Sequence, residues 1–216
     1  MERYDNGTRK LAEYVVDGQV VGTRFWDDDG YLSLERPCKN GLLHGVEYTW
    51  YFDGVLTSAA PYVDGVPHGV AKQWARCGRL VGSYKMVRGT GIDLFWNALE
   101  GIDANPHYLS EVHYMRDGDL HGYTWWLNDD QTSVRVERHY VQGYQHGIDR
   151  EWNHRGRLRR GFPRYFLWGT RVNKRQYLGA VADDPTLPPF RPEDNAPQRV
   201  FPEEIRKHLL IRPADA

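Results

Sequence analysis

Cysteine is scarce in this chain of 216 residues, and long apolar runs are missing. Only Cys38 and Cys77 are present, too few for a disulfide framework, so we expect free thiols in a reducing compartment. No apolar run approaches a membrane span, and the polar start MERYDNGTRKLAEY lacks the apolar core of a signal peptide. These absences predict a cytoplasmic protein.

The chain also lacks an excess of charge and the usual catalytic motifs. Its 28 Lys plus Arg oppose 29 Asp plus Glu, so no whole-protein field draws it to nucleic acid, which we do not expect as a partner. The sequence has no GxSxG elbow, no Walker phosphate loop, no HExxH and no CxxC. We therefore predict a protein that is not an enzyme and that needs no cofactor and no metal.

Glycine and aromatic residues are abundant, and glycine recurs in pairs. Residues that favour turns and strands are common, with 22 Gly, 14 Tyr and 8 Trp. The four best copies of the pair read NGLLHG, DGVPHG, DGDLHG and QGYQHG, with a period of about 24 to 26 residues. The pairs are Gly18 and Gly22, Gly41 and Gly45, Gly65 and Gly69, Gly118 and Gly122, Gly143 and Gly147, with a degraded copy at Gly89 and Gly91.

A second turn lies between successive pairs, for example at Asp53-Gly54, so each repeat should form a β-hairpin. The intervening segments alternate apolar and polar residues, as in 46–52 and 148–152, which predicts strands with one buried and one wet face. The predicted buried residues are Val46, Tyr48, Trp50, Val70, Trp74, Ile92, Leu94 and Trp96, and the predicted wet ones are Glu47, Asp93, Asp149 and Glu151.

Two further residue types recur along the repeats, a tryptophan in six of them and a histidine in four. A tryptophan precedes the second turn, and this row could be a binding platform or a core ladder; its apolar partners favour the core. A histidine precedes the second glycine, and adjacent copies should lie about 9 to 10 Å apart, too far to share one metal ion. We expect these rings to bond nearby backbone. The tryptophans are Trp26, Trp50, Trp74, Trp96, Trp126 and Trp152, and the histidines His44, His68, His121 and His146.

The words NGLLHGVEYTW, DGVPHGVAKQW and QGYQHGIDREW resemble the bacterial variant of the MORN repeat over residues 13–160. The resemblance implies a mainly β fold, an elongated twisted antiparallel sheet of about six tandem hairpins, used as a binding or scaffolding surface. Many bacterial members are labelled antitoxin-like. The chain departs from the pattern at RGTG in the fourth repeat, at Asp129-Asp130, and at an insertion around Ile102 to Pro106 that we expect to form a loop.

Residues 161–216 form a tail in which the repeat pattern stops. Asn173 and Gln176 form a capping signature for a helix that should end at Asp183-Asp184-Pro185. A proline-rich, extended linker follows, and Pro202 should open a second short helix. The tail could cap the last repeats or dock elsewhere. The cap is favoured by five apolar residues that need burial: Leu187, Phe190, Ile205, Leu209 and Leu210.

Residues 150–164 concentrate positive charge, with six arginines against the single acid Glu151. Guanidinium groups could bind an acidic protein, a phosphoinositide head group or nucleic acid there, or could form a solvated sheet edge that does not pair with another chain. The leading hypothesis is a non-enzymatic scaffold that binds another protein, with neutralisation of a toxin as an antitoxin or immunity protein as one such role. The alternative is peripheral membrane binding through the arginines Arg150, Arg155, Arg157, Arg159, Arg160 and Arg164.

Overall fold

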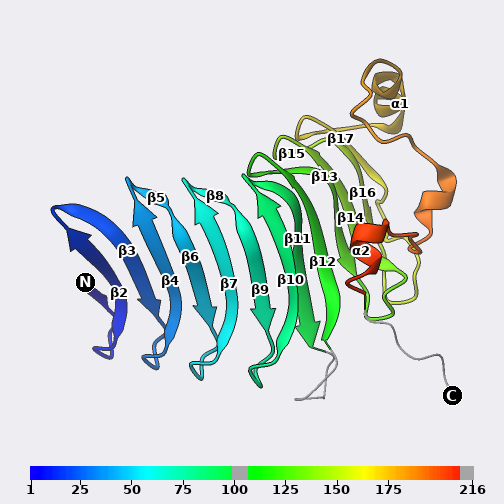
Figure 1. Cartoon of the computed structure of the whole chain (residues 1–216). Helices are drawn as coiled ribbons and strands as arrows, with labels where there is room; N and C mark the ends of the chain where they lie inside the picture. Colours follow the sequence, from blue (N-terminus) through cyan, green and yellow to red (C-terminus); the bar gives the residue numbers. More distant parts are fainter. Residues whose placement is uncertain (99–106, 210–216) are drawn as a thin grey trace, which may run out of the picture. The chain divides into compact units, whose positions relative to one another are not determined.

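The computed structural model describes residues 1–98 and 107–209, and the expected insertion loop and Leu210 lie outside them. The described part of the chain is mainly β, with 56% of its residues in strands or β-bridges, and its helices lie near the C-terminus (Figure 1). The predicted fold class, tandem antiparallel hairpins followed by short helices, is confirmed. The chain divides into two compact units after Gly91, a boundary that falls inside one strand.

The first unit is a succession of antiparallel strands in chain order. Each strand pairs with the one before it, and the two-residue strands β5 and β8 continue directly into β6 and β9. The strands are β1 (Glu2–Arg3), β2 (Arg9–Val16), β3 (Gln19–Trp26), β4 (Leu32–Lys39), β5 (Leu42–Leu43), β6 (Gly45–Trp50), β7 (Leu56–Val63), β8 (Val66–Pro67), β9 (Gly69–Trp74) and β10 (Leu80–Val87).

The second unit continues the hairpin pattern and adds the helices. Its strands are β11 (Thr90–Ala98, from Ile92 on), β12 (His107–Arg116), β13 (Asp119–Leu127), β14 (Val134–Val141), β15 (Tyr144–Gln145), β16 (Gly147–Glu151), β17 (Arg164–Leu167) and β18 (Thr170–Val172). The helices are α1 (Lys174–Asp183), the 3-10 turn η1 (Pro192–Asn195) and α2 (Glu203–Arg206).

The first turn of each hairpin has the same backbone. Two successive residues take positive φ, which is the geometry of a type I′ turn and explains the recurring Asp-Gly and Asn-Gly. The turn recurs a seventh time at Trp168-Gly169, between β17 and β18, where no glycine-pair word marks it. The prediction that the repeats stop at residue 160 is therefore wrong. The seven turns are Asp17-Gly18, Asn40-Gly41, Asp64-Gly65, Arg88-Gly89, Asp117-Gly118, Gln142-Gly143 and Trp168-Gly169.

The repeat histidines join each turn to the next repeat, as expected for rings that bond backbone. The Nδ1 atoms of His44, His68 and His146 accept hydrogen bonds from the backbone N–H groups of Asp64, Arg88 and Trp168. Each of these donors is the first residue of the following type I′ turn. The histidine therefore fixes the stacking of successive hairpins. In the remaining copy, His121 Nδ1 is buried and has no hydrogen-bond partner among residues 1–98 and 107–209.

The second glycine of each pair allows two strands to approach closely. A Cβ at Gly147 would lie 2.7 Å from the Cβ of His139, and φ at Gly147 is +147°. Gly45 and Gly69 have the same relation to Pro37 and Pro61, at 2.9 and 2.7 Å. Any side chain at these positions would have to displace the neighbouring strand.

Replacing Gly147 with alanine should therefore lower the free energy of unfolding by about 3 kcal/mol, from backbone strain and overpacking together. Gly161→Asn is the matched control, because φ at Gly161 is also positive but no atom lies within 4 Å of a Cβ there. Its cost should stay below about 1 kcal/mol. Denaturant unfolding measures both, and equal losses would contradict the close approach at Gly147.

The predicted division into a buried and a wet face is only partly right. Ile92 is half-buried, and Leu94 and Trp96 are buried as predicted, but Val70, a predicted core residue, is 49% exposed. Asp149, predicted to be wet, is buried at 4% exposure. Burial raises the pKa of Asp149, although the charge of Arg138, 3.4 Å away, opposes that shift. Strand alternation sets which residues share a face, but a covering layer decides whether that face is buried.

The tail has the predicted elements. Asn173 is the N-cap of α1 with a complete capping box to Gln176, and the helix ends at the C-cap Asp184. Pro202 precedes α2. The linker between the helices is only partly extended, because it begins with a turn closed by the Leu187 N–H on the Asp184 oxygen and contains the 3-10 turn η1; it runs from α1 beside β17 to α2 (Figure 1).

Candidate functional site

In five repeats, those with Gly45, Gly69, Gly91, Gly122 and Gly147, three equivalent positions share one face of their strand. They are the first, third and fifth residues after the second glycine, which alternate along the strand with residues of the opposite face. We call this surface the column face. Its members in the first unit are Val46, Tyr48, Trp50, Val70, Lys72 and Trp74, and in the second unit Ile92, Leu94, Trp96, Tyr123, Trp125, Leu127, Ile148, Arg150 and Trp152.

In the second unit the tail covers the column face. Ile148, Tyr165, Tyr177 and Leu187 form one buried cluster, in which Tyr177 belongs to α1 and Leu187 to the linker. Further along the tail, Phe201 meets the ring of Trp125 edge-on at 5.5 Å, and His208 meets Trp96 at 5.9 Å. The favoured expectation that the tail caps the last repeats agrees with these contacts.

The tail also supplies polar partners to this face. The indole N–H of Trp152 donates to the backbone oxygen of Asn195 at 2.7 Å, and the guanidinium of Arg199 lies over the Trp152 ring at 5.1 Å. Arg150 donates to the side-chain oxygen of Asn195 at 3.3 Å and lies 3.8 Å from the carboxylate of Asp194. The segment around η1 thus contacts both the charged and the aromatic residue of this repeat, Arg150 and Trp152.

Among the described residues, Arg150 is the largest fully buried side chain, at 2% exposure, and its charge is balanced by Glu137 at 2.7 Å. Glu137 also accepts hydrogen bonds from Arg199 at 2.6 Å and from the Trp125 indole at 2.8 Å. Burial alone would raise the pKa of Glu137, but the hydrogen bond and charge of Arg199 and the charge of Arg150 outweigh it and lower the pKa. Glu137 is therefore an ionised carboxylate held between two guanidinium groups.

In the first unit the same positions are open. Val46, Tyr48, Trp50 and Trp74 are half-buried, and Val70 and Lys72 are exposed. Within the part of the chain that the structure describes, the indole N–H groups of Trp50 and Trp74 have no protein acceptor, and Lys72 has no ion-pair partner. The tryptophan row is thus a buried ladder at Trp96 and Trp152 only, and it is half-exposed elsewhere.

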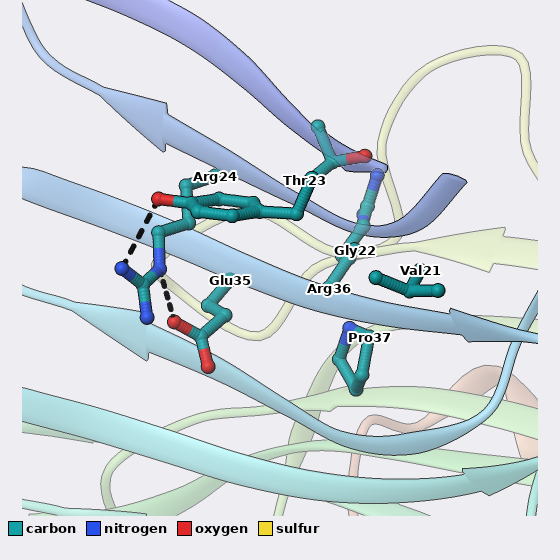
Figure 2. A pocket seen from close by; sticks show the side chains of 8 residues that line it. Val21, Gly22, Thr23, Arg24, Glu35, Arg36 and Pro37 are labelled. Atoms are coloured by element: carbon teal, nitrogen blue, oxygen red, sulfur yellow. Dashed lines mark hydrogen bonds and ion pairs between the residues drawn. The ribbon is translucent and has the colours of Figure 1, made fainter. Parts of the chain in front are cut away.

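A shallow pocket of about 150 Å³ lies on the first unit (Figure 2). Its polar feature is an ion pair between Arg24 and Glu35, with 2.5 Å between Nε and Oε2, and Arg24 also donates to the hydroxyl of Tyr14. Pro37 forms another wall (Figure 2). Glu35 faces Tyr48 across the sheet, so the pocket lies beside the column face.

The six arginines of the predicted cluster differ in burial and in their partners. Arg150 is interior and cannot contact an acidic partner, so its assignment to a binding surface is wrong. Arg159 pairs with Glu151, and the half-buried Arg164 lies over the ring of Phe162 at 4.1 Å. The side chains of Arg155, Arg157 and Arg160 remain exposed in the loop before β17.

Among residues 1–98 and 107–209, no three His, Cys, Asp or Glu side chains gather closely enough to hold a metal ion. The described helices include none with the length and apolar character of a membrane span. Comparison of the chain with protein-family models, curated proteins and solved structures gives no match.

Proposed function

We propose that this chain is a non-enzymatic binding protein and that the column face of its first unit is the surface that binds a partner protein. The observation that supports it is the contrast between equivalent positions. Ile148, Arg150 and Trp152 are 1%, 2% and 4% exposed beneath the tail, whereas Val70 is 49% exposed at the position of Ile148. An open face with aromatic side chains and unpaired donors is typical of protein-binding surfaces.

The resemblance to bacterial MORN-variant repeats adds one partner class to the proposal, a toxin that the chain neutralises. Such a role needs only tight binding and no catalysis. Membrane binding through the arginine cluster has weaker support, because Arg150 is buried and the charges of Arg159 and Arg164 are engaged within the chain.

Affinity capture with paired variants tests the proposal. Val70→Glu places a charge on the column face of the first unit, whereas Val200→Glu places the same charge at a valine of the second unit's tail that is 96% exposed. Burying a lone carboxylate in an interface is costly, so Val70→Glu should reduce the amount of a specific partner captured from the source cell lysate at least about tenfold. Val200→Glu should leave capture unchanged.

Purified partner and chain should then reproduce this difference in a direct binding titration. A partner that binds wild type and Val70→Glu equally well would place the interface elsewhere and contradict the proposal. For a toxin partner, co-expression of wild type or Val200→Glu should restore growth, and co-expression of Val70→Glu should not.

A further inference from the structure

The linker of the second unit shows what kind of segment fits the column face. It runs from the C-cap Asp184 to Phe201, with extended backbone at Arg191 and Ala196 on either side of η1. Leu187 fills the apolar position beside Ile148, Asp194 and Asn195 meet Arg150, and the Asn195 carbonyl accepts from Trp152. One short segment therefore contacts all three column-face residues of this repeat, the apolar Ile148, the charged Arg150 and the aromatic Trp152.

The last full repeat of the first unit offers the same three kinds of group. Val70, Lys72 and Trp74 occupy the positions of Ile148, Arg150 and Trp152. Lys72 keeps the positive charge of Arg150, and Trp74 keeps the indole donor without an acceptor among the described residues. Across the sheet, Val70 pairs with Lys85, an exposed residue that adds a second positive charge to this face.

The cross-strand neighbour of the positive residue differs between the two units, and this difference indicates the charge of the ligand. In the second unit Glu137 lies opposite Arg150 and balances it within the sheet. The residue opposite Lys72 is Ala59, which carries no charge. The open face therefore keeps the positive charge of Lys72, whereas Glu137 neutralises Arg150 on the covered face. The open face favours a ligand with more acidic residues than Asp194, the one that lies near Arg150.

Resting on the proposed function, we propose that the column face of the first unit binds an extended segment of a partner protein, in which acidic residues bounded by prolines follow an apolar anchor. The acids pair with Lys72 and Lys85, a backbone carbonyl accepts the Trp74 N–H, and the anchor packs on Val70. Such a segment loses little conformational entropy on binding because proline already restricts its backbone.

The test uses a synthetic peptide with the sequence of residues 184–201, DPTLPPFRPEDNAPQRVF, as the probe. Titration of the fluorescently labelled peptide with the full chain should give saturable binding. Lys72→Glu should weaken that binding at least about tenfold, because the new carboxylate repels the peptide acids. A peptide with Glu193→Lys and Asp194→Lys should reverse the preference and bind the Lys72→Glu chain more tightly than wild type.

Arg88→Asp is the matched control. It makes the same change of charge at a turn position where Asp17, Asp64 and Asp117 stand in other repeats, so it should fold normally and bind the peptide within about twofold of wild type. Equal affinities for wild type and Lys72→Glu would overturn the proposal, since the peptide would then be displacing the chain's own tail. Concentration-dependent dimers lost on adding peptide would overturn it too, because the occupant would be a second copy's tail.

The peptide titration and the affinity capture can fail independently of each other. If Val70→Glu abolishes capture of a partner but the peptide does not bind, the surface is correct and the inferred segment is wrong. If the peptide binds through Lys72 while capture is insensitive to Val70→Glu, the partner binds another surface and the proposed function fails.

Discussion

Replacing Glu137 with glutamine is expected to lower the free energy of unfolding by about 4 kcal/mol. The Glu137 side chain is 4% exposed and accepts hydrogen bonds from Arg150, Arg199 and Trp125. Glutamine has nearly the same shape, but its NH2 group would face N–H donors, and two guanidinium groups would lose their shared counter-charge. Urea unfolding followed by tryptophan fluorescence measures the loss.

Glu35→Gln is the matched control for this prediction. Glu35 also pairs with an arginine across the sheet, but the side chains of Arg24 and Glu35 are 41% and 30% exposed. A solvated pair contributes little, so Glu35→Gln should cost less than about 1 kcal/mol. Similar losses in the two variants would contradict the buried network.

The stability difference between wild type and Glu137→Gln should also depend on pH. The pKa of Glu137 in the folded protein lies below its ordinary value near 4.5. A carboxylate of this kind stabilises the fold fully above its unfolded pKa, and the contribution is lost as the pH falls through the folded pKa. The difference should therefore be constant near neutral pH and shrink below about pH 4.5; a difference that grows on acidification would contradict this assignment.

The glycine pairs predicted the local structure well because they report backbone requirements. Positive φ at the second turn residue and close strand approach at Gly45 and Gly147 both favour glycine over residues with a side chain. The same logic missed the seventh hairpin, because Trp168 occupies the first position of its turn and no second glycine follows Gly169. Here stacking on His146, with ring centroids 4.4 Å apart and a hydrogen bond to its Nδ1, holds the turn.

The candidate surface was less predictable, because strand alternation identifies a shared face and not what covers it. Alternation places Ile148, Arg150 and Trp152 on one side, so the inward direction of Arg150 was available from the sequence, but local arginine density suggested an exposed cluster instead. Its partners Glu137 and Asn195 lie 13 and 45 residues away. Contacts over such separations follow from the path of the tail, which no short motif encodes.

The column face is covered by the tail in the second unit and open in the first. Cysteine accessibility tests it without any partner. In a background that lacks both native thiols through Cys38→Ser and Cys77→Ser, single cysteines replace Val70 or Ile148, and the rate of labelling by a thiol reagent is measured. Both sites should react equally fast in denaturant, which supplies the reference rate.

Under native conditions the cysteine at position 70 should react at a rate within about tenfold of its rate in denaturant. The cysteine at position 148 should react at least about 100-fold more slowly than that at position 70, because reagent reaches it only when the tail opens. Equal native rates at the two positions, or protection at position 70, would contradict an open first face and a covered second one.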